Sequence, residues 1–259
     1  MAITFTRRQL GRRLRRLRGR RGLREVEATG IVGSTRTIRR LEAGQSVSLT
    51  FPAIGRLAEY YGAPAELCAE LENMFKAADR PWGDRYGESV IKGFPLFIEL
   101  EYMASELRIF EPNLVTGLLQ TEEYARELHR RNEIDAATVQ ARMEIWERRL
   151  GTFWSREPRP VVKVLMGEWA LPGLGGADQL ARLRSPDAEV RVLSTAGAPH
   201  PLLRGPFMIL RFPEDTDEPD CVYTEGLEGS RYDEVAETAA IYHRVFEQSF
   251  DRGLPIEEF

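Results

Sequence analysis

The sequence has few cysteines, few lysines and no long apolar run, and each shortage excludes a class of protein. Its two cysteines, Cys68 and Cys221, are isolated from each other, which indicates a reduced protein without a disulfide framework. No stretch reaches about 18 consecutive apolar residues, so we expect no membrane-spanning helix. Hydrophobic residues still make up 42% of the chain, which is enough to build buried cores.

Histidines are also few, and the sequence contains no recognisable catalytic pattern. The three histidines lack the spacing of metal ligands and are read as surface or packing residues: His129, His200 and His243. The glycine-rich and serine-containing motifs of nucleotide-binding and hydrolytic enzymes are missing. Four glutamates could supply paired carboxylates, but we read them as a solvated helix face: Glu99, Glu101, Glu106 and Glu111. We therefore expect no catalytic residue, no metal and no cofactor, and an enzymatic body is the weaker alternative.

Charge is distributed unevenly along the chain. Residues 1–50 hold thirteen arginines and three glutamates, a net charge of +10, so the rest carries −14 within the total of −4. Only three residues are lysines, which indicates a coding preference for arginine, but such a preference would not remove acidic residues from one end. The asymmetry favours a head that binds a polyanion, joined to an acidic body.

Periodic apolar residues predict five short helices in the basic head. Four are delimited by capping residues, prolines or glycines, among them the segment 34–43, which Ser34 can cap and Gly44 ends. A shorter segment lies between the first two, and together the five cover residues 6–21, 24–29, 34–43, 50–61 and 64–78. We therefore expect a mainly α-helical domain over residues 1–78.

A break in every periodic pattern follows the head. Residues 79–95 contain two prolines and three glycines and mark a linker to a second domain over residues 96–259. In this domain we expect helices first and strands later, which is typical of an α+β fold. The expected helices cover 97–110, 121–132, 136–151 and 232–250, and the expected strands cover 161–166, 189–193, 207–212 and 221–224.

The segment 34–43 carries the strongest functional signal. On a helical wheel, Ser34, Ile38 and Leu41 fall on one side and are expected to pack inward. Three arginines lie on the opposite side with Thr35 beside them: Arg36, Arg39 and Arg40. The major groove of DNA admits a helix, and the arginine fork matches O6 and N7 of guanine, so this helix fits a base reader. The arginines of the first helix would then contact phosphates.

Two other readings of this basic surface remain open. The three arginines could be an ordinary solvated helix face, as most charge runs are. The basic first helix could instead bind an anionic membrane surface, although Leu10, Leu14 and Leu17 form a stripe narrow enough to suit a small core better.

Residues 10–61 resemble the helix-turn-helix of the XRE (Cro/C1-like) family of transcriptional regulators. The matching positions are Leu14, Leu17, Arg18, Gly22, Leu23, Ala28, Ser34, Ile38, Leu41, Glu42, Gly44, Leu57 and Ala58. The resemblance implies that Arg18 pairs with Glu42 and ties the first helix to the recognition helix. It also implies that Thr35, Arg36 and Arg40 read bases while Arg39 contacts a base or a phosphate, and we place Ser34 and Arg24 among the DNA-contacting residues.

The head departs from that family at two places. The interval from Gly22 to Glu42 is one residue shorter than is usual, and Arg24 stands where the family commonly has a capping threonine. We therefore expect the second helix to be shortened or irregular, which weakens the case for a phosphate contact there but leaves the recognition helix unaffected.

The body resembles a domain of unknown function that follows an XRE head in many actinobacterial regulators. The likeness covers about residues 94–250 and is most specific in GLLQTEEYAR, residues 117–126, although Thr116 stands where proline is usual. Such proteins are called antitoxin-like, and the resemblance implies a small partner protein encoded nearby. Read physically, the decapeptide is either a structural turn followed by a helix capped by Thr121, or the edge of a ligand or partner pocket. The residues of that pocket would be Gln120, Tyr124 and Glu225.

The sequence thus predicts a cytoplasmic, nucleoid-associated regulator that binds an operator in double-stranded DNA and does not bind membranes. A homodimer is expected, because one small head offers few base contacts and two half-sites about 34–36 Å apart double them. The body would dimerise and receive a signal. In the alternative reading the chain is an antitoxin-like interaction module, and its DNA binding serves autoregulation.

Overall fold

The computed structural model describes residues 5–78, 94–131, 135–194, 205–216, 218–226 and 229–259. Contacts divide the chain into two units, residues 1–87 and 88–259. The expected linker, residues 79–95, lies outside the described residues except at its last two positions. These two positions already belong to a helix, α6 (Phe94–Met103), so the regular structure of the body begins earlier than the sequence predicts.

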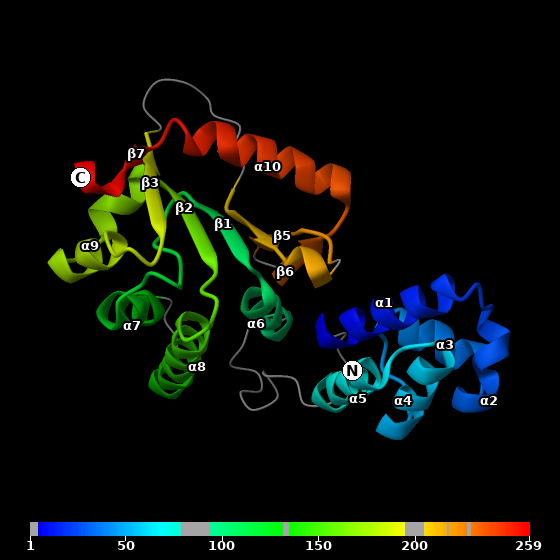
Figure 1. Ribbon diagram of the computed structural model, residues 1–259. Coiled ribbons are helices and arrows are strands. Elements are labelled where there is room, and N and C mark those ends of the chain that lie inside the picture. The colour runs from blue at the N-terminus through cyan, green and yellow to red at the C-terminus, as the bar shows by residue number, and fades with distance from the viewer. Residues whose placement is uncertain (1–4, 79–93, 132–134, 195–204, 217, 227–228) are drawn as a thin grey trace. The chain divides into compact units, whose positions relative to one another are not determined.

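The head is a bundle of short helices, and a mainly α-helical head is confirmed (Figure 1). Its elements are α1 (Phe5–Arg20), the 3-10 turn η1 (Glu25–Ala28), α2 (Thr29–Val32), α3 (Thr35–Glu42), α4 (Phe51–Tyr60) and α5 (Ala65–Ala78). The second predicted segment is irregular, as expected. The 3-10 turn η1 is followed directly by the four-residue helix α2, and the two stand in place of one continuous helix.

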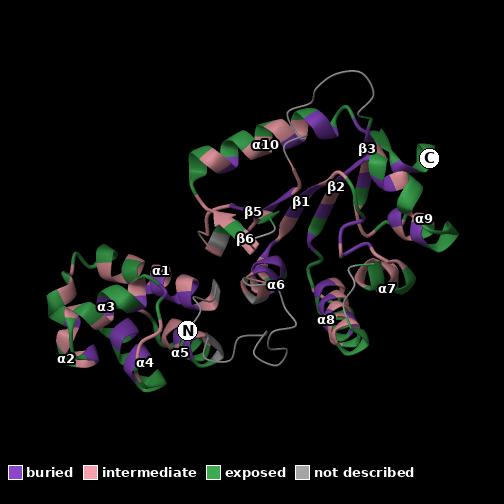
Figure 2. Ribbon diagram, turned by 180° about the vertical axis from the view of Figure 1, so that it is seen from behind, coloured by how far each residue is buried: buried purple, intermediate pink, exposed green. Residues whose placement is uncertain are grey.

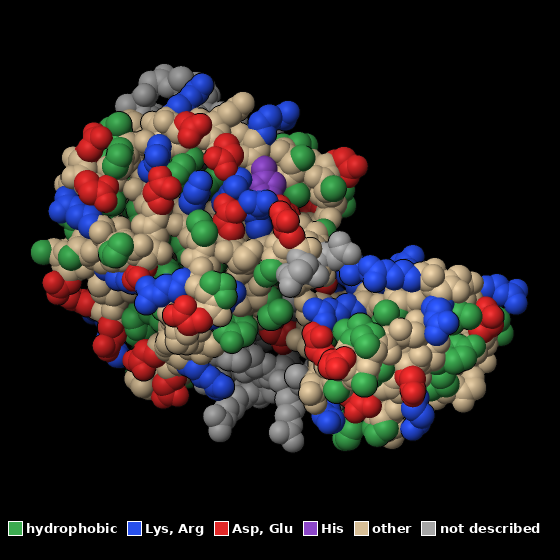
Figure 3. Space-filling view, in the orientation of Figure 1, with side chains coloured by type: hydrophobic (Ala, Val, Ile, Leu, Met, Phe, Trp, Pro, Cys, Tyr) green, Lys and Arg blue, Asp and Glu red, His purple; other side chains and the backbone are tan. Residues whose placement is uncertain are grey.

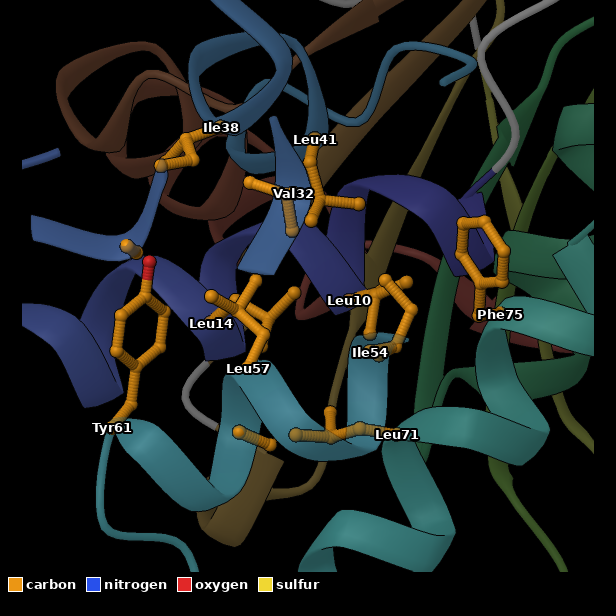
Figure 4. Packing of buried hydrophobic residues seen from close by; sticks show 12 residues of the cluster. Leu10, Leu14, Val32, Ile38, Leu41, Ile54, Leu57, Tyr61, Leu71 and Phe75 are labelled. Carbon is orange, nitrogen blue, oxygen red and sulfur yellow. The ribbon is translucent and has the colours of Figure 1, made fainter. Parts of the chain in front are cut away.

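Every helix of the head contributes to one apolar core (Figure 4). Its large buried side chains from α1, α3, α4 and α5 include Leu10, Leu14, Ile38, Leu41, Ile54, Leu57, Leu71 and Phe75. Burying one such side chain contributes roughly 1.5–3 kcal/mol. The core therefore fixes which side of α3 faces inward.

A glycine ends α3. The backbone of Gly44 has φ +70°, a left-handed conformation that glycine adopts without a steric penalty. The amide of Gln45 then donates to the carbonyl of Arg40 at 2.8 Å and closes the last turn. A side chain at position 44 would also meet the backbone of Arg8 in α1, with its Cβ 2.7 Å from Cα of Arg8. The length of α3 is therefore fixed at this end.

The body is built on a seven-stranded mixed sheet, so the α+β fold class is confirmed. Its strands are β1 (Glu106–Glu111), β2 (Val161–Gly167), β3 (Glu189–Leu193), β4 (Phe207–Arg211), β5 (Cys221–Gly226), β6 (Gly229–Asp233) and β7 (Leu254–Pro255). They lie in the order β6-β5-β4-β1-β2-β3-β7. Strands β1, β2 and β3 are parallel, and the other pairings are antiparallel.

Helices cover both faces of the sheet (Figure 1). On one face, α10 (Ala236–Phe250) packs Phe246 and Phe250 against Phe110, Leu165 and Phe207 of the strands. On the other face lie α6, α7 (Glu122–Arg131), α8 (Ala136–Trp154) and α9 (Ala177–Leu183). Buried residues line the strands and the inner sides of these helices in Figure 2.

Two predicted helices of the body are wrong at one end. The segment 97–110 is not one helix, because α6 stops at Met103 and β1 follows; Leu107 and Ile109 alternate inward in a strand paired on both sides. The segment 232–250 includes part of β6, where Tyr232 lies opposite Tyr223, and the helix starts only at Ala236. Strand pairing is non-local and here outweighs the local helix signal. The other predicted helices and strands of the body are present, and helix α9 (Ala177–Leu183) and strands β6 and β7 were not predicted.

We expect Phe246→Ala to lower the free energy of unfolding of the body by about 3–5 kcal/mol, because it removes a fully buried ring between α10 and the sheet. Denaturant unfolding followed by tryptophan fluorescence measures this. Ile241→Ala on the same helix is the control, since that side chain is 52% exposed and should cost little. Equal stability of both variants would contradict the assigned role of α10 as the cover of the sheet.

Candidate functional site

Helix α3 begins with a side-chain cap. Ser34 has extended backbone, and its Oγ accepts a hydrogen bond from the amide of Thr37 at 3.1 Å. Serine is among the preferred residues at this position because its oxygen satisfies an amide that the helix leaves unpaired. The expectation that Ser34 packs inward is wrong, because a capping side chain must reach back to the helix end and Ser34 is exposed.

The two long sides of α3 differ sharply. Ile38 and Leu41 are buried in the core of the head. The three arginines of the helix are all exposed: Arg36, Arg39 and Arg40. Thr35 lies half-buried at the helix start. The core therefore holds α3 so that its three arginines lie along the exposed side, an arrangement that fits a major groove. We call Arg36, Arg39 and Arg40 the cationic ridge of α3.

Two of these arginines are held by neighbouring groups. Nε of Arg39 lies 2.5 Å from Oε2 of Glu25 in η1, and Nη2 of Arg40 donates to the carbonyl of Ser46 at 2.9 Å. Exposed ion pairs contribute only about 0–1 kcal/mol, so a phosphate or a base can replace Glu25 at little cost. No motif in the sequence marks Glu25 as a partner of Arg39, so this ion pair was not predicted.

Arg24 stands at the start of η1 with an 83% exposed side chain. Its backbone amide donates to the carboxylate of Glu27 at 2.6 Å, which closes the turn in the absence of the threonine cap usual in the XRE family. Nε of Arg24 lies 3.8 Å from Oε2 of the same Glu27, and the guanidinium stays largely exposed and available to a ligand.

An ion pair ties α1 to the end of α3. Nε and Nη2 of Arg18 lie 2.6 and 2.7 Å from the two carboxylate oxygens of Glu42, and Nη1 of Arg18 donates to the carbonyl of Leu23 at 2.9 Å. Both side chains are largely buried. The hydrogen bonds to Glu42 raise the pKa of Arg18 although burial opposes this, so the guanidinium stays charged.

Further basic side chains gather over α1 (Figure 3). Arg15 and Arg20 are exposed there, whereas Arg7 is buried and Arg13 forms an ion pair with Glu70 of α5. Some arginines of the first helix therefore have a structural task, and the exposed ones are left as candidates for phosphate contacts.

In the body, the decapeptide at residues 117–126 begins with a turn that four side chains hold in place, one of them Arg182, which donates to the carbonyl of Leu118 at 3.3 Å. The carbonyls of residues 117–119 accept hydrogen bonds from Trp146 at 3.1 Å, Trp154 at 3.3 Å and Gln179 at 2.8 Å, in that order. The amide oxygen of Gln179 also accepts from the amide of Thr121 at 2.9 Å. Helices α8 and α9 thereby fix the turn between β1 and α7.

A cleft of about 410 Å³ lies beside this turn, where β1 ends and β4 begins. Gln120 and Glu225 both line it, so the structure brings these two predicted residues together. Gln120 also donates to the carbonyl of Val115 at 2.8 Å. Tyr124 does not line the cleft; its hydroxyl accepts from the amide of Val115 at 3.1 Å and so positions the cleft wall.

Two of the four glutamates read as a solvated helix face, Glu101 and Glu106, are instead held in ion pairs. Glu101 in α6 is buried, and its two oxygens lie 2.6 and 2.7 Å from Nη2 and Nε of Arg149 in α8. Glu106 lies in β1 and pairs with Arg108 and Arg211, which lower its pKa against the opposing effect of burial. The reading failed because these partners lie far away in sequence or in a strand that was predicted as helix.

Among the residues that the structure describes, no group of three or more histidine, cysteine, aspartate or glutamate side chains could hold a metal ion. His243 lies 2.6 Å from Asp220, and His129 is partly buried, which lowers its pKa. His200 lies outside the described residues. In the same described part of the chain, none of the helices is long and apolar enough to cross a membrane.

Comparison with known proteins assigns a family description to each unit. A family model described as "Domain of unknown function (DUF5753)" matches residues 94–258, more than half of the chain. A second, described as a helix-turn-helix domain, matches residues 9–71. The head is therefore a helix-turn-helix domain.

Similarity to individual proteins is limited. No curated protein matches the chain. One solved structure, of TrmBL2, an archaeal chromatin protein described as having a novel mode of DNA binding, is 14% identical over 81% of this chain and 72% of that chain, with a TM-score of 0.33. At so low a TM-score, fold and function must be argued from this chain's own residues.

We expect Glu42→Ala to lower the stability of the head by about 2 kcal/mol, because it leaves the largely buried Arg18 unpaired. Hydrogen exchange of the full chain, read by mass spectrometry on peptides from α1 and α3, should then accelerate by roughly 30-fold. Glu59→Ala, an exposed glutamate of α4, is the matched control. Unchanged protection in Glu42→Ala would show that this pair does not hold α3 on α1.

Proposed function

We propose that this chain, which belongs to the DUF5753 family, is a sequence-specific DNA-binding transcriptional regulator with a head of XRE type. Helix α3 is the recognition helix in this proposal. The observation that carries it is the orientation of α3, whose apolar side is buried in the head while its three arginines are exposed. The helix-turn-helix match over residues 9–71 supports the same role.

The residues of the head divide into base readers and phosphate contacts. Arg36 and Arg40, with Thr35 beside them, read base edges, because a guanidinium can donate two hydrogen bonds to O6 and N7 of one guanine. Arg39 and Arg24 lie at the side of η1 and contact a base or a phosphate. Ser34 caps the helix and so presents its first turn to the DNA.

The net charge of +10 on residues 1–50 supplies the part of the affinity that does not depend on base sequence. Each phosphate that an arginine neutralises releases counterions, so the affinity for DNA falls steeply with salt concentration. The exposed arginines of α1 make these contacts in the proposal. The protein then acts in the cytoplasm, associated with the nucleoid.

The body dimerises and receives a signal in this account. A homodimer places two α3 helices on half-sites about 34–36 Å apart, which doubles the base contacts of one small head. The cleft beside the turn at residues 117–119 is the place for the signal, because pockets of a few hundred Å³ with a few polar groups are typical ligand sites.

A second candidate function is the antitoxin-like one, in which the body binds a small protein encoded nearby. Trp169 favours it, because its side chain is 68% exposed and tryptophan is enriched in protein interfaces. If this is correct, the product of a short adjacent reading frame co-purifies with the wild-type chain and is lost with Trp169→Ala. If the partner co-purifies equally well with Trp169→Ala, Trp169 gives no support to this function.

We expect Arg36→Ala and Arg40→Ala each to weaken operator binding by about 5- to 150-fold, since one good guanine contact contributes roughly 1–3 kcal/mol. The operator is first selected from random duplex DNA with the wild-type chain, and affinity is then measured by fluorescence anisotropy at constant salt. Thermal unfolding should be unchanged, because both side chains are exposed.

Arg130→Ala is the matched control for these variants, because it removes an exposed arginine from α7 in the body and changes the net charge equally. It should bind the operator like the wild type. The same affinity for all three variants would rule out the exposed side of α3 as the reading surface.

A further inference from the structure

Aromatic rings form much of the wall of the body cleft. Phe94 and Phe97 come from α6, Phe207 from β4 and Tyr223 from β5. The ring centroids of Phe97 and Tyr223 lie 4.4 Å apart, and those of Phe94 and Phe97 lie 5.7 Å apart. The faces of such rings carry partial negative charge and attract cations.

The same wall already holds one cation of the protein itself. The guanidinium carbon of Arg149 lies 5.1 Å from the ring centroid of Phe97 and 6.0 Å from that of Phe94. Its charge is balanced by Glu101, which accepts two hydrogen bonds from it. Arg149 therefore adds no net positive charge to the cleft.

The glycine of the decapeptide packs directly against the guanidinium of Arg149. A Cβ on Gly117 would lie 2.7 Å from Nη1 of Arg149, so any larger residue would push against this buried group. Arg149 also lines the cleft, and its Nη1, which takes no part in the two hydrogen bonds to Glu101, can donate a hydrogen bond to a carbonyl or hydroxyl oxygen of a ligand.

Two carboxylates complete the lining. Glu111 ends β1 and Glu225 lies near the end of β5. Oε2 of Glu225 accepts a hydrogen bond from the hydroxyl of Tyr223 at 3.1 Å. Burial raises the pKa of Glu111, hydrogen bonds from the backbone amides of Asn113 and Leu114 oppose this rise, and the negative charge of Glu225 adds to it. Since Arg149 is paired with Glu101, no cationic side chain among the described lining residues is left to balance Glu111 and Glu225, and a bound cation would stabilise the ionised form of both.

We infer that the cleft binds a free organic cation, a small molecule with an ammonium group on an aromatic or apolar body. The ammonium group lies at Glu111 and Glu225, the body packs on the aromatic wall, and Arg149 donates to a neutral acceptor. An anionic ligand is disfavoured, because it would face two carboxylates without an uncompensated positive charge. This inference rests on the signal-receiving role proposed for the body and names the chemical class of the signal.

The test uses the full chain without DNA, so its failure leaves operator binding untouched and can be told apart from failure of the regulator proposal. Isothermal titration calorimetry compares 2-phenylethylammonium and benzyltrimethylammonium with the neutral 2-phenylethanol and the anionic 3-phenylpropanoate. A lysine blocked at its α-amino and carboxyl groups, with a free side-chain ammonium, represents a protein partner. We expect both aryl cations to bind at least tenfold more tightly than the neutral, anionic and lysine probes.

Variants then locate the binding. Glu111→Gln and Glu225→Gln each keep one acceptor oxygen and remove the charge, so each should weaken cation binding about tenfold without changing thermal unfolding. Glu147→Gln removes the same charge from an exposed position on α8 and should bind like the wild type. Three results would overturn the inference: no detectable binding of either cation, binding of the neutral probe as tight as that of the cations, or cation binding by both cleft variants as tight as by the wild type. A preference for blocked lysine would overturn it in favour of a protein ligand.

Discussion

The ion pair between Arg18 and Glu42 is the interaction on which the head depends. It joins α1 to the last turn of α3 through two hydrogen bonds from one guanidinium to one carboxylate. Burying such a pair gains little net stability, because both charges lose water, but losing one partner is costly. The pair therefore acts less as a source of stability than as a specification of where α3 lies. With Ile38 and Leu41 in the core, the helix has one orientation left, and its arginines face outward.

The body contains a second buried ion pair of the same kind. Arg149 and Glu101 join α8 to α6 by a bidentate pair that is more deeply buried than the one in the head. Here too, the pair fixes two helices that are distant in sequence and leaves a surface with a defined chemistry beside it. In the head that surface is the cationic ridge of α3, and in the body it is the aromatic and acidic wall of the cleft.

The sequence was most informative where the cause of a structure is local. The period of α3, its serine cap and its terminal glycine all lie within eleven residues, and the arginine side of the helix followed from them. The pair of Arg18 and Glu42 spans 24 residues and was reachable only through resemblance to the XRE family. Strand β1 and Tyr232 were misread because strand pairing depends on partners far along the chain. Glu101 looked like a solvated residue, since nothing near it in sequence indicates that Arg149, 48 residues away, is its partner. The aromatic wall escaped notice for the same reason, because its rings come from three elements that only the fold brings together.

Helix α3 reads the major groove in the proposed function, and chemical protection of operator DNA tests this most directly. Dimethyl sulfate methylates N7 of guanine in the major groove and N3 of adenine in the minor groove. Bound full-length protein should protect guanine N7 in two patches one helical turn apart and leave adenine N3 reactive there. Protection confined to adenine N3, or no protection at protein concentrations that saturate the operator, would contradict the placement of α3 in the major groove.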